Sequence, residues 1–560
     1  MAANNAHNLP TATLWKTHDV TNQPPPFEGR NLYAADTVLR DAVHREGGSW
    51  GEDQLHQYGE RVGGALWEAG FDANRNPPEL HTHDRYGHRV DQVTFHPAYH
   101  QLMDAAIGNG LHALSWDQDG VGAQVVRSAL MYLHNQAESG TMCPVTMTHA
   151  AVPALRHQPD VARIWEPRIL SRQYDARFLP PEQKTGVTLG MGMTEKQGGS
   201  DVRANTTQAI PVGAEGPGRD YELIGHKWFF SAPMSDAFLV LAQSRGGLSC
   251  FLLPRWCPDG SVNAIRIQRL KDKLGNRSNA SSEVEFLNAH AVMVGEEGRG
   301  VATIIDMVAQ TRLDCMIGSG SLMRHGLAHA MHHCAHRKAF GSTLLKQPLM
   351  RNVLADLALE VEGATALTFR VAAALDRQQD DPAEAAFARI ATALGKYWIC
   401  KRAAGHITEA QECLGGAGYV EEHVLPRLYR EAPVNAIWEG SGNIQCLDVL
   451  RAMQKSPETV QVVMDELRQA RGENRHLDAA IQRIESRLGG NAELPMEARV
   501  LVEDLVLALQ GGLLVRAGRQ AVADAFCAAR LGPERTLLYG GLPDGLDTDI
   551  ILTRASPQEA

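Results

Sequence analysis

The chain has 560 residues, of which 44% are hydrophobic and 21% charged, and its formal net charge is −11. Its length exceeds what one hydrophobic core usually organises, so we expect several domains. The composition is that of an ordinary globular protein, without the run of about 18 apolar residues that predicts a membrane span. The negative charge argues against general affinity for nucleic acid, although it leaves room for a local basic face.

The first residues and the cysteines indicate the compartment. The opening stretch, Met-Ala-Ala-Asn-Asn-Ala-His-Asn, lacks the basic and apolar segments of a secretory signal peptide. The nine cysteines are scattered singly and form no Cys-x-x-Cys pair. We therefore expect a cytoplasmic protein with unpaired thiols, without disulfides or a zinc site.

The predicted elements run in the order helices, strands, helices. Residues 1–30 are rich in Pro and Asn and are expected to be extended. Helical periodicity covers about 36–177, with a polar loop at 81–89, and it returns at 301–453 and at about 457–540. This order disfavours a Rossmann sheet. The short runs between the helical regions are typical of strands: 221–224, 237–242, 248–253, 264–268 and 282–286.

A glycine-rich loop, 191–207, stands near the start of the strand region. It places the hydroxyl groups of Thr194 and Ser200 among three glycines and a run of backbone amides. Because glycine has no Cβ, such a loop can approach a planar or anionic ligand closely. The spacing is neither Gly-x-Gly-x-x-Gly nor that of a P-loop, so from these residues alone a plain turn is the other interpretation.

Glu439 is the strongest candidate for a proton-transferring side chain. It lies between Trp438 and Gly440, a large apolar ring and a residue without a side chain. An apolar neighbour raises the pKa of a carboxyl group by desolvating its charged form, as a general base working near neutrality requires. The alternative is a glutamate at a helix start beside a core tryptophan.

Four motifs together resemble the acyl-CoA dehydrogenase superfamily. They are Thr-Glu-x-x-x-Gly-Ser-Asp in the 191–207 loop, the run at 414–419, the Arg-x-x-Arg-Glu-Ala run from Arg427, and Ile-Trp-Glu-Gly-Ser at 437–441. Lys196-Gln197 is similar to the AidB-like, alkylation-response members. The resemblance implies an α+β, mainly α fold with four domains: an N-terminal helical domain (1–183), a flavin-binding β-barrel domain (184–299), a four-helix bundle (300–455) and an extra C-terminal helical domain (456–560).

The resemblance implies FAD as the cofactor and an acyl-CoA as the substrate. Glu439 would remove the α-proton of the acyl group while a hydride passes to the flavin N5. Some members carry this base just before an Arg of the bundle, but here Thr311 precedes Arg312 and cannot serve. Phe229 would pack on the isoalloxazine and Ser231 would reach N5. The implied cofactor contacts are Met191, Gly192, Met193, Thr194, Ser200, Phe229, Phe230, Ser231, Ile437, Trp438, Gly440, Ser441 and Asn443.

A second group of contacts implies a homo-oligomer, with a tetramer expected. Arg337-Lys-Ala-Phe-Gly341 resembles the element that reaches the FAD pyrophosphate of a neighbouring subunit, and Gln347 would follow it. An arginine suits this task because its guanidinium can grip phosphate in a bidentate manner. Glu412 replaces a usual Gln and Lys196 a usual Pro or small residue. These departures point away from an ordinary fatty-acid oxidiser.

A run of histidines stands out between residues 325 and 336. Its i, i+4 spacing on a helix could hold a metal ion. The run contains no His-Glu-x-x-His motif and no carboxylate, so we predict no metal site and expect solvated or helix-capping histidines. The run consists of His325, His329, His332, His333 and His336.

The region after residue 456 is rich in arginine. Arg468, Arg471 and Arg475 are predicted to share one helical face, and Arg483 and Arg487 follow. Such a run is either a solvated face with ion pairs along the helix or a face that contacts phosphates. The AidB-like resemblance implies a C-terminal domain that binds double-stranded DNA, and we assign these five arginines to it.

Three functional hypotheses follow. The first is an FAD-containing protein that binds and protects DNA in the response to alkylation and has weak acyl-CoA dehydrogenase activity. The second is a working acyl-CoA dehydrogenase with no role on DNA. The third is a scaffold stabilised by flavin, without turnover.

Overall fold

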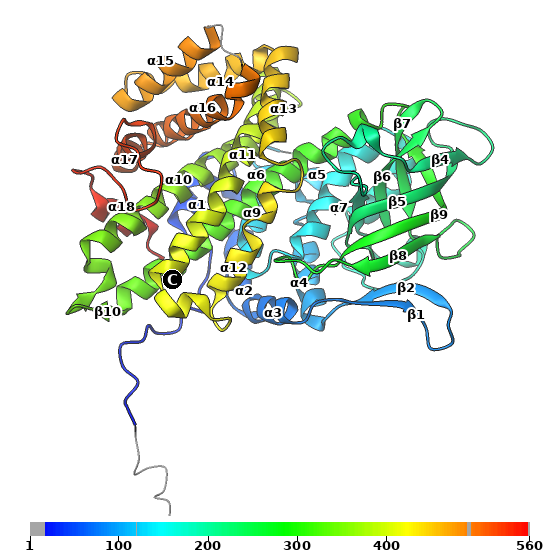
Figure 1. The fold of residues 1–560 in the computed structure, drawn as a ribbon, viewed down its shortest axis with the longest axis horizontal. Coiled ribbons are helices and arrows are strands. Elements are labelled where there is room, and N and C mark those ends of the chain that lie inside the picture. Colours follow the sequence, from blue (N-terminus) through cyan, green and yellow to red (C-terminus); the bar gives the residue numbers. More distant parts are fainter. Residues whose placement is uncertain (1–16, 119, 490–493, 558–560) are drawn as a thin grey trace, which may run out of the picture.

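The computed structural model describes residues 17–118, 120–489 and 494–557. A helical body fills one side of the molecule in Figure 1 and a strand-rich region fills the other. The predicted α+β, mainly α fold of the acyl-CoA dehydrogenase type is confirmed. Within the described ranges no helix combines the length and the apolar character needed to cross a membrane.

The N-terminal region is helical apart from one hairpin. Residues 17–30 form neither helix nor strand, in agreement with the extended segment predicted there. The polar loop predicted at 81–89 is shorter, because its flanks pair as strands β1 (Glu79–His83) and β2 (Arg89–Thr94). The turn is closed by Asp84, whose Oδ1 accepts hydrogen bonds from two backbone amides. The helices are α1 (Thr37–Arg45), α2 (Glu52–Gly63), α3 (Ala65–Arg75), α4 (Pro97–Gly108), α5 (Leu114–Asp117), α6 (Ala123–Ala137), α7 (Met142–Leu155) and α8 (Pro159–Ile169).

The strand region closes into a barrel. Hydrogen bonds link β6 to β7, β7 to β9, β9 to β5, β5 to β4, and β4 back to β6. Strand β3 runs parallel to β6, and β8 lies along β9. The five predicted strands correspond to β5–β9. The strands are β3 (Leu189–Gly192), β4 (Gln208–Pro211), β5 (Asp220–Ser231), β6 (Ala237–Ser244), β7 (Gly247–Pro254), β8 (Ile265–Leu270) and β9 (Ser281–Val294).

Long helices form the bundle that follows. Helix α9 is buried along most of its length because α6 and α7 cover one side of it while α10 and α11 cover another. A small hairpin, β10 (Lys338–Ala339) and β11 (Ser342–Thr343), separates α9 from α10. The bundle helices are α9 (Gly300–His336), α10 (Pro348–Arg377), α11 (Pro382–Cys413), α12 (Val424–Glu431) and α13 (Gly442–Lys455).

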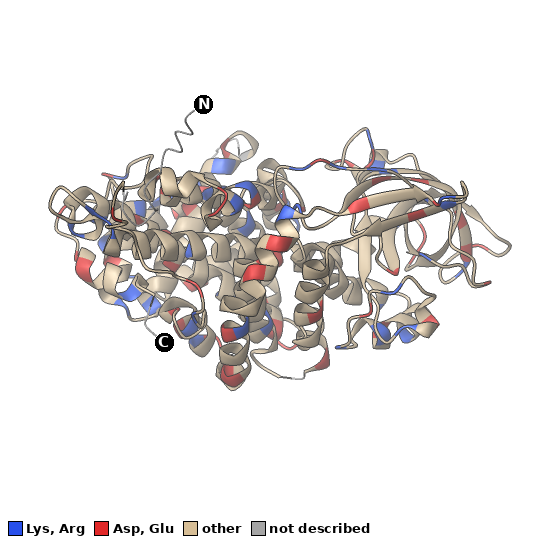
Figure 2. Ribbon diagram, turned by 90° about the horizontal axis from the view of Figure 1, so that it is seen from below, with Lys and Arg blue, Asp and Glu red and all other residues tan. Residues whose placement is uncertain are grey.

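The C-terminal helices pack on the bundle rather than standing apart from it. One hydrophobic core continues from the N-terminal helices through the bundle into α14–α18. Buried ion pairs reinforce the contact, as where Arg530 lies 2.6 Å from Asp356 of α10. Basic and acidic residues are interspersed over the helical body (Figure 2). The helices are α14 (Glu458–Arg468), α15 (Arg475–Gly489), α16 (Leu494–Arg516), α17 (Gln520–Leu531) and α18 (Thr548–Ala555).

Candidate active site

Glu439 lies in the turn that leads into α13. Its backbone has a φ of +57°, a left-handed conformation that is uncommon for a residue with a Cβ, and Gly440 follows with a φ of +93°. The Glu439 carboxylate meets helix α9, where Thr311 Oγ1 donates a hydrogen bond of 2.7 Å to Oε2. A non-glycine residue stays in this conformation only where surrounding contacts over-determine it. The turn therefore fixes the direction of one carboxylate.

Side chains from other parts of the bundle anchor the Glu439 turn. Lys396 of α11 donates to the carbonyl oxygens on either side of Glu439, at 2.6 and 2.5 Å. Arg312 Nε donates to the Glu439 carbonyl at 3.2 Å, and Gln445 Nε2 donates to the same oxygen at 3.0 Å. Arg312 is itself paired with Asp448 at 2.6 Å. Thr311 and Arg312, which mark the alternative base position, thus hold the Glu439 turn in place.

The surroundings of Glu439 tune its acidity. Burial raises the pKa of Glu439 above that of an ordinary glutamate, and the hydrogen bond from Thr311 opposes this rise. Trp438 packs beside it against a buried cluster shared by the barrel and α7, and its Nε1 donates to Asn435 at 3.0 Å. The carboxylate is therefore a stronger proton acceptor than an exposed one.

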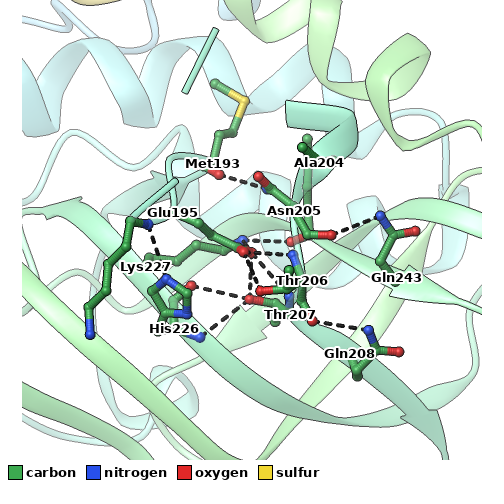
Figure 3. A network of polar contacts seen from close by, with 12 residues as sticks. Met193, Glu195, Ala204, Asn205, Thr206, Thr207, Gln208, His226, Lys227 and Gln243 are labelled. Carbon is green, nitrogen blue, oxygen red and sulfur yellow. Dashed lines mark hydrogen bonds and ion pairs between the residues drawn. The ribbon is translucent and has the colours of Figure 1, made fainter. Parts of the chain in front are cut away.

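The glycine-rich loop after β3 is pinned by a fully buried ion pair (Figure 3). Lys227 Nζ lies 2.8 Å from Glu195 Oε1, and both side chains are 0% exposed. The Glu195 carboxylate also accepts hydrogen bonds from the backbone and hydroxyl groups of Thr206 and Thr207. Burial alone would raise the pKa of Glu195, but the Lys227 ammonium lowers that pKa below its usual range. Such a satisfied network gives the loop one defined shape.

Two glycines of this loop allow approaches that a side chain would prevent. A Cβ on Gly192 would lie 2.6 Å from the Phe230 ring, and one on Gly199 would lie 2.4 Å from Thr194 Oγ1. The space beside the Thr194 hydroxyl is open only because Gly199 lacks a side chain. This arrangement of hydroxyl, backbone and open space fits a flavin.

The predicted cofactor contacts at the end of β5 lie on two different faces of the strand. Phe229 is 50% exposed, whereas Phe230 is 0% exposed and packs against Phe238 inside the barrel with 4.2 Å between ring centroids. Successive side chains of a strand point to opposite faces, so the two rings cannot share one role. The Phe230 ring belongs to the barrel core, so the predicted cofactor contact of this residue would involve its backbone rather than its ring. Phe229 and Ser231 lie on the other face.

Cys143 of α7 connects the barrel with the Glu439 turn. It lies in one buried cluster with Ala232, which follows the end of β5, and Trp438 of the Glu439 turn packs against that cluster. Burial raises the pKa of Cys143 to about 11, so the thiol stays neutral. Met191, Met193 and Trp438 pack against the same buried cluster. The structure thus brings the β3 loop, the end of β5 and the Glu439 turn to one place.

The start of α13 carries further predicted contacts and one residue that sequence reasoning missed. Ile437 is 66% exposed, and Ser441 is the N-cap residue of α13. Asn443 is exposed, and its Oδ1 accepts hydrogen bonds of 2.7 and 2.9 Å from Arg499 of α16. Arg499 lies 56 positions from Asn443, so no local motif could have revealed this contact.

Arg337 and Gln347 lie far from this cluster in the same chain. Arg337 follows the end of α9, and 25 helical steps separate it from Arg312 (337 − 312), or roughly 38 Å at 1.5 Å per residue. Figure 1 places β10 at the end of the helical body away from the barrel. Gln347 Nε2 donates to Ser342 Oγ at 2.7 Å, so Gln347 contacts the β10–β11 hairpin that directly follows Arg337.

The prediction that three arginines share one helical face was wrong. Helix α14 ends at Arg468 and α15 begins at Arg475, with Arg471 in the turn between them. Gly472 has a φ of +89°, and Asn474 Oδ1 accepts hydrogen bonds from the first amides of α15. This glycine and this capping asparagine divide what the arginine spacing suggested was one helix.

Three of the five arginines assigned to DNA are paired with carboxylates. Arg468 and Arg471 lie 3.4 and 3.5 Å from Glu485, and Arg487 lies 3.3 Å from Glu497. Arg475 and Arg483 are exposed.

Four of the five histidines in the run are not solvated as predicted, because His325, His329, His332 and His333 are 2–9% exposed at the end of α9. His336 is exposed, and its Nδ1 donates to the carbonyl oxygen of His332. In the described parts of the chain no three His, Cys, Asp or Glu side chains are arranged to hold a metal ion.

Three family models match consecutive parts of the chain. They are the adaptive response protein AidB N-terminal domain at 22–176, the acyl-CoA dehydrogenase middle domain at 190–289 and the acyl-CoA dehydrogenase C-terminal domain at 298–454. Together with the barrel, the bundle and the Glu439 turn, they define an FAD-dependent oxidoreductase of the acyl-CoA dehydrogenase type.

Individual relatives narrow this class. Escherichia coli AidB is 48% identical over 520 residues, which cover 92% of this chain and 95% of AidB. The chain therefore belongs to the AidB branch of the acyl-CoA dehydrogenase family. The structure of Caenorhabditis elegans ACDH-11 in complex with C11-CoA covers 98% of this chain and 95% of its own, with a TM-score of 0.82 and 26% identity. The apo form of Bd2924 covers 90% and 100%, with a TM-score of 0.81 and 29% identity.

Proposed function

We propose that this protein dehydrogenates an acyl-CoA thioester and that Glu439 is the base that removes the α-proton. The observation that carries the proposal is the Glu439 carboxylate, which a left-handed backbone and a 2.7 Å hydrogen bond from Thr311 hold at the junction of barrel and bundle. FAD, when bound, supplies the acceptor for the hydride. A positioned base contributes roughly 10²–10⁴-fold to such a reaction.

The residues around Glu439 have distinct tasks in this proposal. Thr311 stabilises the charged form of Glu439 and so maintains a deprotonated fraction that can accept a proton. Lys396 and Arg312 hold the turn by donating to its backbone carbonyl oxygens. Trp438 shields one side of the Glu439 carboxylate from water. The flavin would be held by the hydroxyls of Thr194, Ser200 and Ser231, by Phe229, and by the backbone at 191–193 and 440–443.

We further propose that the protein works as a homo-oligomer, with a tetramer expected. The distance between Arg337 and Arg312 along α9 supports this, because one copy cannot bring Arg337 to its own Glu439. A second copy would supply Arg337 and Gln347 to the flavin. The nine free cysteines support a location in the reducing cytoplasm.

The anaerobic reaction of the bound flavin with acyl-CoAs of increasing chain length tests the proposal. We expect one range of chain lengths to bleach the flavin of the wild-type protein, and Glu439→Gln to slow bleaching at least about 10²-fold. Glu421→Gln is the matched control, because that carboxylate is 69% exposed. Absence of bleaching by every acyl-CoA would overturn the proposal that this protein works as an acyl-CoA dehydrogenase.

Contact with double-stranded DNA is a second candidate function. The exposed side chains of Arg475 and Arg483 support it, whereas the ion pairs of Arg468, Arg471 and Arg487 favour the solvated-face interpretation. We expect Arg475→Glu together with Arg483→Glu to weaken duplex binding and to reduce its dependence on salt. Unchanged binding would remove DNA contact from this face. A role in the response to alkylation depends on this result.

A further inference from the structure

The chain begins its described course by crossing the far end of the bundle. Residues 22–30, which we name the N-terminal strap, run over the C-terminal end of α9 and the start of the β10–β11 hairpin. Asn22 makes three of the contacts. Its carbonyl oxygen accepts a hydrogen bond of 2.8 Å from Arg337 Nη1, its Oδ1 accepts one of 2.7 Å from Lys338 N, and its Nδ2 donates one of 2.9 Å to Lys338 O.

The buried histidine run is the surface on which this strap lies. Phe27 packs against His332 and His329 with 4.4 and 4.8 Å between ring centroids. His332 Nε2 donates to Pro25 O at 2.9 Å, and the Arg30 guanidinium lies 4.8 Å from the centre of the Phe27 ring. The histidines therefore act as aromatic and hydrogen-bonding partners of the strap.

The sequence of the strap is suited to hold its two contacting residues, Asn22 and Phe27, at a fixed distance from each other. Three consecutive prolines, Pro24–Pro26, stand between Asn22 and Phe27. Proline fixes φ and favours an extended polyproline II course, so little conformational entropy is lost when this segment docks. Asn22 has a φ of +60°, which asparagine tolerates better than most residues, and this directs its side chain and carbonyl toward the hairpin.

We propose that the N-terminal strap is a positioning element for Arg337, which it orients for contact with the FAD of a neighbouring subunit. This inference rests on the proposed function, in which Arg337 reaches that flavin. A guanidinium has five N–H donors. The hydrogen bond to Asn22 occupies one of them, and it fixes the plane of the group before any phosphate arrives, so less side-chain entropy is lost when the contact forms.

FAD titrations of the apoprotein test the strap in four single variants. Asn22→Gly keeps the backbone carbonyl that Arg337 contacts, but it removes the two side-chain hydrogen bonds to Lys338 that hold this carbonyl in place, and glycine accepts the positive φ. Phe27→Ala removes the packing of the strap on His329 and His332, which is separate from the contact with Arg337. Arg337→Met removes the contact itself. Gln23→Ala is the matched control, because that side chain is exposed within the strap.

We expect Asn22→Gly and Phe27→Ala to raise the dissociation constant for FAD about tenfold, the size of one hydrogen bond to a charged group. Arg337→Met should raise it at least as much, and Gln23→Ala should leave it unchanged. Adding Asn22→Gly to Arg337→Met should cause no further loss, because the strap acts through Arg337. The unfolding midpoint of each apoprotein and its mass by light scattering should stay at the wild-type values.

Other results separate failure of the strap from failure of the proposed function. If Arg337→Met weakens FAD binding and neither strap variant does, the strap is not a positioning element, while the flavin contact stands. If Arg337→Met has no effect, the assignment of Arg337 to the flavin fails and the inference fails with it. Additive losses in the double variant, or dissociation of the oligomer in the strap variants, would overturn positioning through Arg337.

Discussion

Two ion pairs of this molecule have similar chemistry and opposite surroundings. The side chains of Lys227 and Glu195 behind the glycine-rich loop are both 0% exposed, with 2.8 Å between their charged atoms. The pairs of Arg468 and Arg471 with Glu485 are 3.4 and 3.5 Å long, and their side chains are 32–53% exposed. The degree of burial determines the effect of each pair. The buried pair restricts the glycine-rich loop to one conformation, whereas the exposed pairs add little to the rigidity of the surface.

Breaking the buried pair should have the largest effect. Lys227→Met leaves the Glu195 carboxylate buried without its cation, so we expect the free energy of unfolding to fall by about 3–5 kcal/mol. Chemical denaturation measures this change. The double variant Lys227→Met/Glu195→Gln is the control, because it removes both charges and should regain part of the loss. A single variant as stable as the wild type would show that the pair does not hold the loop.

An intermediate effect is expected at Thr311, whose partner Glu439 is only partly buried. Thr311→Val removes the hydrogen bond that lowers the pKa of Glu439, so this pKa should rise further. A proton acceptor works when deprotonated, so activity should be lost from the acidic side. We expect about a tenfold fall of kcat/KM on the acidic limb, and the limb should move toward higher pH.

The matched control for this prediction is Thr311→Ser, which keeps the hydroxyl donor and should keep the wild-type pH profile. The prediction fails if the acidic limb of Thr311→Val stays in place or moves toward lower pH. Either outcome would mean that Glu439 is not the group whose ionisation limits the reaction.

The exposed pairs should show the smallest effect. Glu485→Gln removes a carboxylate that both Arg468 and Arg471 contact, while Arg468 keeps its pair with Asp465 at 2.9 Å. We expect the unfolding free energy to change by less than about 1 kcal/mol. Thermal unfolding at low and at high salt is the measurement, and any difference from the wild type should shrink as salt rises. A loss as large as that of Lys227→Met would show that these arginines belong to a structural network.

Sequence patterns predicted those parts of the fold whose conformation is determined by residues close together in the sequence. The strands β5–β9 follow from short apolar runs between turn residues, and the Glu439 turn follows from a motif that occupies consecutive positions. The hairpin of β1 and β2 was missed because its residues are mostly polar and only two of them are buried, so no apolar alternation marks the strands. The burial of the Phe230 ring in the barrel core was not predicted, because the motif did not distinguish the two faces of β5.

Contacts between distant residues could not be predicted in this way. Asn22 and Lys338 lie 316 positions apart, and Asn443 and Arg499 lie 56 apart. Neither pair belongs to a periodic pattern, because the contact exists only after the helices have packed. The break between α14 and α15 has a local cause, Gly472 with Asn474, but the spacing of the arginines across it resembled one continuous face.

Helix α9 has a consequence for how the protein takes up its cofactor. Its 37 residues carry Thr311 and Arg312 in one part and end directly before Arg337. In the proposed oligomer, this single helix therefore holds the Glu439 turn of its own subunit and, at its other end, leads to the arginine that reaches the flavin of a neighbour. Binding of FAD at one site would restrict the position of the α9 helix that completes the FAD site of the neighbouring subunit. Flavin uptake by the apoprotein should then follow a sigmoidal curve, with partly loaded oligomers scarce at half saturation.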